Sequence, residues 1–279
     1  MIYATFYQLQ TAEHFLESLV QGIEKRIEID YVDLRGPVFE TWDQRALLVH
    51  LVYKGFAEAV CFPSDGSPVP PTDVIHRNPV VLAPGYFVHM DPSHAEIHSR
   101  MLASGIRELQ GEIGEAKTTP RGFFCLTLGP SNTTDLPPAV PDLLHRIDTL
   151  RSRGGDVLLF RAQELYTITD FVNRYTEELV RFVVGLSVVI RAFEDRYTKL
   201  DGGFLEALSH LLAQNVSIYA YPMTTADLKE AIQRISATDW EWDETDGLVS
   251  ARQLRPALPR RHLYAYVLDS NFLVPIQGA

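Results

Sequence analysis

A group of histidines and one aspartate between residues 89 and 98 could bind a metal ion or move protons. His89 and Asp91 precede an apolar pattern of helical spacing, and His94 and His98 lie within it. Side chains four positions apart share one face of a helix. The set His89, Asp91, His94 and His98 can therefore supply ligands to a divalent ion, which would activate a bound water. The segment Asp91–Pro92–Ser93 is also typical of a capped helix start, which is the alternative interpretation.

Other candidates follow apolar runs that we expect to be strands, because ligands of parallel sheets bind beyond the carboxyl ends of the strands. Arg161 follows DVLLF at 156–160 and could hold a carboxylate or a phosphate, or it could pair with a nearby acid. With Arg161 as the anion clamp, His89 or His94 would be the catalytic general base. The candidate substrate-binding residues are Gly85, Tyr86, Gly129, Ser131, Asn132, Gln163 and Glu164.

Several well-defined motifs are absent from the sequence. It contains no G-x-G-x-x-G, no G-x-x-x-x-G-K-[ST] and no G-x-S-x-G. A dinucleotide fingerprint, a P-loop and a serine-hydrolase elbow are therefore excluded as local motifs. Cys61 and Cys125 lie in apolar runs and are expected to be reduced core residues.

Strand-like and helix-like patterns alternate along most of the chain. Because this alternation is typical of βαβ units, we predict an α/β fold: a mainly parallel, Rossmann-like sheet with helices on both faces. The runs are apolar throughout, as in strands covered on both faces. Expected strands are 59–62, 79–83, 123–128, 156–160, 180–186 and 216–221; expected helices are 94–109, 140–153, 164–175, 188–197, 204–214 and 262–268.

An N-terminal helical segment is expected before this domain. Thr11 precedes one helical pattern, and a second helix fits residues 42–56. We therefore place a helical segment at 1–57 and the α/β domain at 58–279. An insert near 239–261 is acidic first and basic later, which indicates either a self-paired surface loop or a partner-binding segment.

Composition indicates an ordinary globular chain, and the candidate residues at the strand ends favour a small-molecule substrate as its partner. The 279 residues include 46% hydrophobic and 22% charged residues and carry a net charge of −11. This charge disfavours nucleic acid as a partner. The N-terminus has no signal-peptide pattern and no apolar run is long enough to cross a bilayer, so we expect a cytoplasmic protein that is not bound to a membrane. The apolar C-terminal tail leaves a homodimer open.

Stretches within residues 45–276 resemble one family of bacterial proteins. They are LLVHLVYKGFAEAVCF (47–62), DVLLFRAQELYTITDFVNRYT (156–176), DGGFLEALSHLLAQNVSIYAYPM (201–223) and RRHLYAYVLDSNFLVPI (260–276). The family is commonly named nicotinamide- or nicotinate-nucleotide adenylyltransferase. The resemblance implies an α/β fold and a nucleotide or phosphorylated ligand. Gly85 and Phe87 match a G-S-F-x-P segment of that family, whereas Tyr86 and His89 depart from it, and the H-x-G-H signature of adenylyltransferases is absent.

Three functions remain open at this point. The first is an enzyme acting on a small polar or phosphorylated, nucleotide-related metabolite at the carboxyl-end loops. The second is a metal-dependent enzyme that uses the cluster at residues 89–98 and a divalent ion. The third is a non-catalytic, nucleotidyltransferase-like protein that binds a ligand or a partner.

Overall fold

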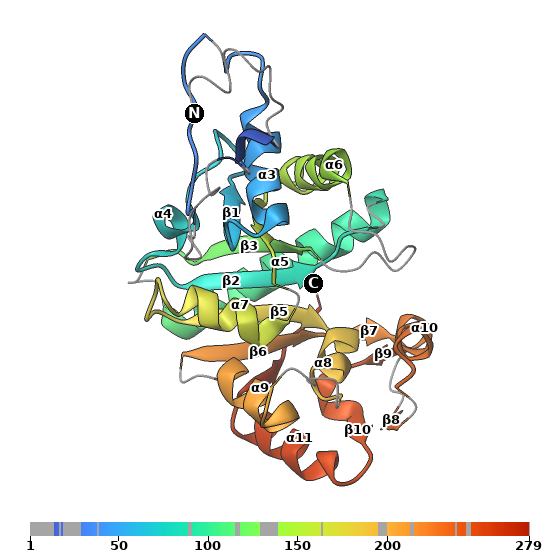
Figure 1. Ribbon diagram of the computed structural model, residues 1–279. Coiled ribbons are helices and arrows are strands. Elements are labelled where there is room, and N and C mark those ends of the chain that lie inside the picture. Colours follow the sequence, from blue (N-terminus) through green and yellow to red (C-terminus); the bar gives the residue numbers. More distant parts are fainter. Residues whose placement is uncertain are drawn as a thin grey trace. The chain divides into compact units, whose positions relative to one another are not determined.

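The structure is a computed structural model, and Figure 1 labels its elements. It describes residues 14–16, 18, 29–37, 39–88, 91–114, 118–128, 139–162, 164–194, 200–212, 215–237, 239–243 and 247–278. The helices are α3 (Gln44–Lys54), α4 (Pro71–Ile75), α5 (Pro92–Ile113), α6 (Val140–Arg151), α7 (Leu165–Val172), α8 (Leu186–Ala192), α9 (Gly203–Leu211), α10 (Thr225–Ile235) and α11 (Arg260–Asp269), with a short 3-10 helix, η1 (Ala251–Gln253). The strands are β1 (Ala59–Phe62), β2 (Val80–Gly85), β3 (Arg121–Thr127), β4 (Asp156–Phe160), β5 (Val180–Gly185), β6 (Val216–Tyr221), β7 (Met223–Thr224), β8 (Trp240–Trp242), β9 (Leu248–Val249), β10 (Leu254–Pro256) and β11 (Leu273–Pro275).

The main sheet has seven strands in the order β1-β4-β3-β2-β5-β6-β11. β5 pairs in parallel with β2 and with β6, and β6 pairs in parallel with β11, whereas β1 at one edge runs antiparallel to β4. Starting at β2, the chain adds β3 and β4 on one side and then β5, β6 and β11 on the other. This is the strand order of a doubly wound α/β sheet, extended by one antiparallel strand. The predicted fold class, a mainly parallel sheet surrounded by helices, is confirmed.

The central strands form because their residues are apolar on both faces. Every residue of β1 is buried, and in β4 and β5 only one terminal residue of each is not. Such runs are stable only where helices cover both faces of a sheet. The strands predicted from the sequence are therefore found within one or two residues of their expected ends.

Some elements differ from those expected. The helix α10 and the small sheets β7–β9 and β8–β10 were not predicted from the sequence. The acidic part of the insert near 239–261 was expected to be a surface loop, but residues 240–242 form β8. That prediction was wrong because acidic residues alternate there with tryptophans, and the buried Trp240 anchors the strand. The helix expected after Thr11 lies mostly outside the described residues.

By compactness the chain divides into two units. Unit 1 comprises Met1–Val74, Gly85–Asp91 and Cys125–Gln163, and unit 2 comprises Ile75–Pro84, Pro92–Phe124 and Glu164–Ala279. The domain boundary predicted between residues 57 and 58 stays a prediction.

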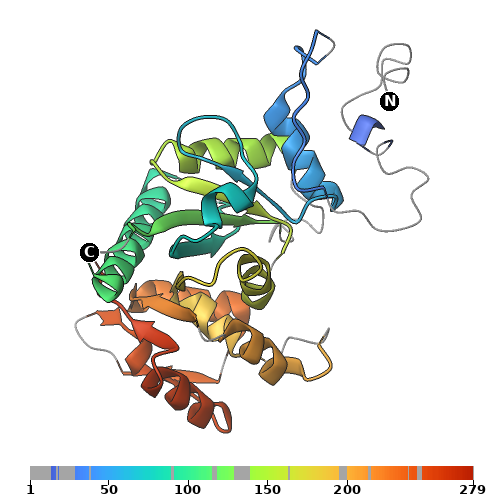
Figure 2. The same ribbon diagram turned by 90° about the vertical axis from the view of Figure 1, so that its left-hand side faces the viewer.

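Unit 1 has its core between α3, α6 and the strands β1 and β4. The two helices lie side by side, as both views show (Figures 1 and 2). Buried leucines face inward from each helix, Leu47 and Leu51 from α3 and Leu143 and Leu150 from α6. The helix α3 begins at Asp43, whose carboxylate accepts a hydrogen bond from the Arg45 N–H at 2.9 Å, as an N-cap does.

Unit 2 packs α5 closely against β2 and β5. A Cβ atom added at Gly105 would lie 2.9 Å from Cγ1 of Val81 and 3.1 Å from Cβ of Val183. The helix therefore approaches the sheet at a point where only glycine fits. This contact determines how α5 lies on the strands of its unit.

The acidic-then-basic insert is paired with itself and with its own unit. β8 and β10 form an antiparallel pair, and Asp243 forms an ion pair with Arg255. Arg260 contacts Glu194 at 2.9 Å, and the same carboxylate oxygen accepts the indole N–H of Trp240 at 2.9 Å. The self-paired interpretation therefore describes these residues.

Replacing Gly105 by alanine should destabilise the protein by about 1–3 kcal/mol, because the added methyl group overpacks the contact between α5 and the sheet. The matched variant is Gly111→Ala on the same helix, where an added Cβ meets nothing within 4 Å. That variant should stabilise the protein by up to about 1 kcal/mol through helix propensity. Urea denaturation gives the free energy of unfolding of both variants and of the wild type. Equal stability of the two variants would contradict the close packing.

Candidate functional site

A strained turn lies at the carboxyl end of β2. Phe87 has a φ of 49° and its side chain is buried. Its ring folds back over Gly85, where an added Cβ would lie 3.1 Å from Cζ of the ring. A bulky residue with positive φ is uncommon and costs free energy. Such strained residues cluster at functional sites, so the turn Gly85–Phe87 is the first component of the candidate site.

A buried arginine holds this turn. Arg146 lies in α6 with only 9% of its side chain exposed, and its Nη1–H donates to the carbonyl oxygen of Tyr86 at 2.8 Å. Its Nη2 forms an ion pair with Asp142, one helical turn earlier. The hydroxyl of Thr127, at the end of β3, lies 3.4 Å from the carbonyl oxygen of Gly85. These groups form what we call the strand-end cluster: Gly85, Tyr86, Phe87, Thr127, Asp142 and Arg146.

The strand-end cluster contains one donor that has no acceptor within the described part of the chain. The Nε–H of Arg146 is buried and makes no hydrogen bond there. A buried donor left unsatisfied costs about 1–3 kcal/mol. The charge of the guanidinium is balanced by Asp142, whose side chain is 46% exposed. The cluster therefore holds one buried N–H group for which the described residues supply no acceptor.

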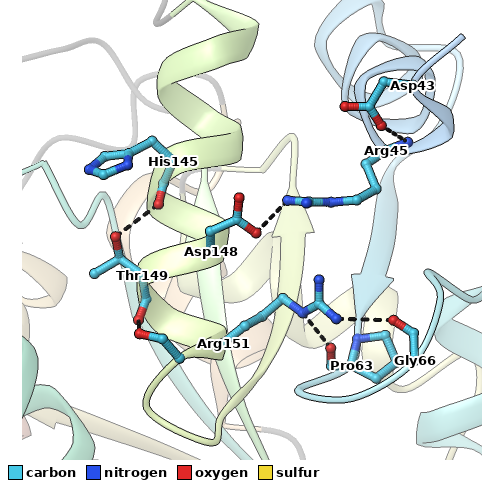
Figure 3. Close-up of polar contacts among 9 residues, drawn as sticks. Asp43, Arg45, Pro63, Gly66, His145, Asp148, Thr149 and Arg151 are labelled. Carbon is cyan, nitrogen blue, oxygen red and sulfur yellow. Dashed lines mark hydrogen bonds and ion pairs between the residues drawn. The ribbon is translucent and has the colours of Figure 1, made fainter. Parts of the chain in front are cut away.

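The position of Arg146 depends on how α6 is fixed in unit 1 (Figure 3). Asp148 of α6 contacts Arg45 of α3 at 2.5 Å. Arg151, at the end of α6, donates to the carbonyl oxygens of Pro63 at 2.6 Å and Gly66 at 3.0 Å. These contacts tie both the middle and the end of α6 to the layer formed by α3 and the loop after β1.

Arg161 lies directly after β4, as expected, but its surroundings are specific. Its N–H donates to the carbonyl oxygen of Glu58 at 3.0 Å, which continues the β1–β4 pairing. Its guanidinium lies against Gly55, where an added Cβ would be 2.4 Å from Nη1. Gly55 is the left-handed C-cap of α3. A cation at the carbonyl end of a helix stabilises that helix, so this contact gives Arg161 a structural role. Its predicted role as an anion clamp stays a prediction.

The histidine pair of unit 2 lies on α5, as its spacing predicted. His94 is exposed in the first turn of the helix and His98, one turn later, is half-buried. Burial and, next, the charge of His94 lower the pKa of His98 to about 4. Asp91 is an exposed residue of unit 1. No group of three or more potential metal ligands occurs among the described residues. Because His89 lies outside them, the predicted metal site stays a prediction.

Several predicted substrate-binding residues also fall outside the described residues, namely Gly129, Ser131, Asn132 and Gln163. Glu164 is described and is the N-cap of α7, where its carbonyl oxygen accepts from the Thr167 N–H at 3.1 Å and the Ile168 N–H at 3.2 Å. Of the predicted set, the structure brings Gly85 and Tyr86 together in the strand-end cluster. Sequence reasoning missed Arg146, because an Asp–Arg pair four residues apart in a helix looks like an exposed ion pair.

A second buried arginine organises unit 2. The side chain of Arg181, in β5, is 6% exposed and forms an ion pair with Glu112, at the end of α5. The carboxylate of Glu112 also accepts the Nε–H of Arg181 at 3.0 Å and the hydroxyl of Tyr219 at 2.8 Å. Partial burial alone would raise the pKa of Glu112, but the hydrogen bonds and charge of its partners outweigh it and lower that pKa. The pKa of Tyr219 is raised by burial and by Glu112.

Comparison with known proteins returns no match to a family model, to a curated protein or to a solved structure. The resemblance to nucleotide adenylyltransferases therefore stays an expectation, and any function must be argued from the geometry. Within the described residues, no helix has both the length and the apolar character needed to span a membrane.

Glu112→Gln should lower stability at pH 7 by about 1–3 kcal/mol, because it leaves the buried charge of Arg181 uncompensated. This range lies below the full effect of a buried pair, since 42% of the Glu112 side chain is exposed. A carboxylate whose pKa is lowered on folding stabilises the protein at pH values above 4.5, which is the ordinary pKa of this group. That contribution is lost as the pH falls through the folded-state pKa.

The free energy of unfolding, measured from pH 7 down to pH 3, tests this prediction. The difference in the free energy of unfolding between the wild type and Glu112→Gln should become smaller as the pH falls. Glu96→Gln is the control, because Glu96 pairs with Arg100 on the exposed part of the same helix. It should change stability by less than about 0.5 kcal/mol. A difference that is constant with pH would contradict the role of the Glu112 carboxylate.

Proposed function

We propose that the chain is an enzyme acting on a small polar or phosphorylated metabolite, which binds at the strand-end cluster of unit 1. One observation carries the proposal: the buried Arg146 holds a strained turn at the carboxyl end of β2. A strained turn is retained only where the surrounding structure over-determines it. Here α6 supplies that constraint through Arg146 and its own anchors on α3.

The place of the turn in the sheet supports a ligand site. In doubly wound sheets, ligands bind outside the carboxyl ends of the strands, near the strand at which the order reverses. In this sheet the order reverses at β2, since β3 and β4 follow on one side and β5 on the other. The turn Gly85–Phe87 directly follows this strand.

The chemistry of the cluster supports an anionic ligand. The charge of Arg146 is paired with Asp142, but its buried Nε–H has no acceptor among the described residues. A phosphate or carboxylate oxygen would supply that acceptor through a charge-assisted hydrogen bond.

The test is a thermal-shift screen with inorganic phosphate, AMP, ADP, ATP and ribose 5-phosphate. At least one probe should raise Tm, because a ligand that binds only the folded state stabilises it. Arg146→Gln should weaken binding of that probe by at least about tenfold. Arg153→Gln is the control, since it removes one exposed positive charge just after α6.

Since Arg146→Gln removes a buried ion pair and so threatens the fold, Tyr86→Ala provides a second variant. The Tyr86 side chain is half-buried and its carbonyl oxygen survives the change. Tyr86→Ala should weaken binding of the same probe while the protein stays folded. If no probe binds, or if both variants bind as well as Arg153→Gln, the proposed site is wrong. If a probe binds but mass spectrometry finds no product from it or from its mixtures with the other probes, the chain is a binding protein rather than an enzyme.

A metal-dependent enzyme is the second candidate function. The observation that favours it is the placement of His94 and His98 one turn apart on α5, which allows two imidazoles to face one ion. Within the described residues no third ligand joins them. His89, the further ligand that the sequence predicts, lies outside the described residues.

Elemental analysis of the protein, purified without a histidine tag, tests this candidate. About one equivalent of zinc, iron or manganese is expected, and His94→Ala should lose it with the circular dichroism spectrum unchanged. His145→Ala is the control, because this histidine is exposed on α6 and belongs to the other unit. Metal content that is equal in wild type and His94→Ala would exclude the site.

A further inference from the structure

A pocket in unit 2 shares no residue with the strand-end cluster. It has a volume of about 510 Å³ and is formed between the C-terminal part of α5 and the strands β5, β6 and β11. Pockets of roughly 300–1,000 Å³ are the usual size for small-molecule sites. Arg181 and Ser217, which line it, are the second residues of their strands, so the pocket lies toward the amino ends of β5 and β6.

One carboxylate in this pocket is held rigidly. Glu112 accepts hydrogen bonds from the guanidinium of Arg181 and from the hydroxyl of Tyr219. Arg181 is itself fixed, because its Nη1 donates to the backbone carbonyl oxygens of Val180 at 3.0 Å and Asn215 at 2.9 Å. The side chain of Glu112 remains 42% exposed. A charged group that is both ionised and fixed costs little to orient when a ligand binds.

Charges of both signs line the pocket from one helix. Glu108 and Glu112 are one turn apart on α5, and Arg107 stands in the neighbouring row. Arg107 and Glu108 are exposed, and Nη2 of Arg107 donates to the hydroxyl of Ser104 at 3.0 Å. The pocket therefore presents two carboxylates on α5 and, beside them, the guanidinium of Arg107.

This arrangement discriminates between classes of ligand. Glu112 is already paired with Arg181, so Glu108 and Arg107 are the charges of opposite sign that remain for a ligand. A plain anion could pair with Arg107 but would be repelled by Glu108, and a plain amine could pair with Glu108 but would be repelled by Arg107. A ligand that carries a positive and a negative charge a few bonds apart can pair with the carboxylate and with the guanidinium at the same time.

We propose that this pocket binds a small zwitterion that carries an ammonium and a carboxylate group, that is, an amino acid. The ammonium group faces Glu108 and Glu112, and the carboxylate faces Arg107. Ser217 and Asn271, which also line the pocket, add neutral hydrogen-bonding groups, and Val274 gives an apolar contact for a side chain. The proposal does not rest on the proposed function, since every residue involved belongs to unit 2.

The test measures binding of the individual proteinogenic L-amino acids to the full chain by isothermal titration calorimetry. Butylamine and butyrate, each with one of the two charges, are the matched probes. At least one amino acid should bind with a Kd at or below about 1 mM, and both single-charge probes should bind at least about tenfold more weakly. No binding of any amino acid at about 10 mM, well above that Kd, would overturn the proposal.

Variants of exposed residues locate the site without threatening the fold. Arg107→Gln and Glu108→Gln should each weaken binding of the amino acid at least about tenfold, because each removes one of the two complementary charges. Arg100→Gln, on the same helix outside the pocket, is the control and should bind as the wild type does. Unchanged affinity in both pocket variants would show that the amino acid binds elsewhere and would overturn the assignment.

Discussion

Arg146 and Arg181 are the buried charged residues among those that the structure describes, and each must have its charge compensated where it lies. A guanidinium removed from water is tolerated only when a carboxylate and backbone carbonyl oxygens surround it. Both arginines bind a half-exposed carboxylate of a helix. Arg146 also binds the carbonyl oxygen of Tyr86, just after β2, and Arg181 binds those of Val180, at the start of β5, and Asn215, just before β6. The constraint therefore joins one helix to one strand in each unit.

In unit 1, this joint gives the strand end its shape. The carbonyl oxygen of Tyr86 is held by Arg146, and the next residue, Phe87, keeps its positive φ with its ring over Gly85. Removing any of these contacts would let the chain relax toward an ordinary extended exit from β2. The candidate ligand site thus depends on helix packing, because the ion pair between α6 and α3 helps to hold the helix that carries Arg146.

In unit 2, the same kind of joint has a different consequence. Arg181 and Tyr219 lie on adjacent strands and both bind Glu112, so the end of α5 is fastened over β5 and β6. Glycine at position 105 lets the helix approach the strands closely enough for this contact. The carboxylate that results is oriented by buried partners but still reaches a pocket. Rigid support beneath an exposed charge is what distinguishes a binding group from an ordinary surface residue.

The sequence by itself determined the strands and their mainly parallel arrangement. A strand that is buried on both faces appears as a continuous apolar run, and such a run must be covered by helices on both sides of the sheet. The sequence also placed Gly85 at a strand end. Only the tertiary structure decided which arginine is buried. Arg161, which follows a strand, is exposed with its guanidinium near Gly55, whereas Arg146, which looked like half of an exposed helical pair, is buried. The reason is that burial depends on the surfaces that other segments bring to a residue, and a local pattern contains no record of those distant partners.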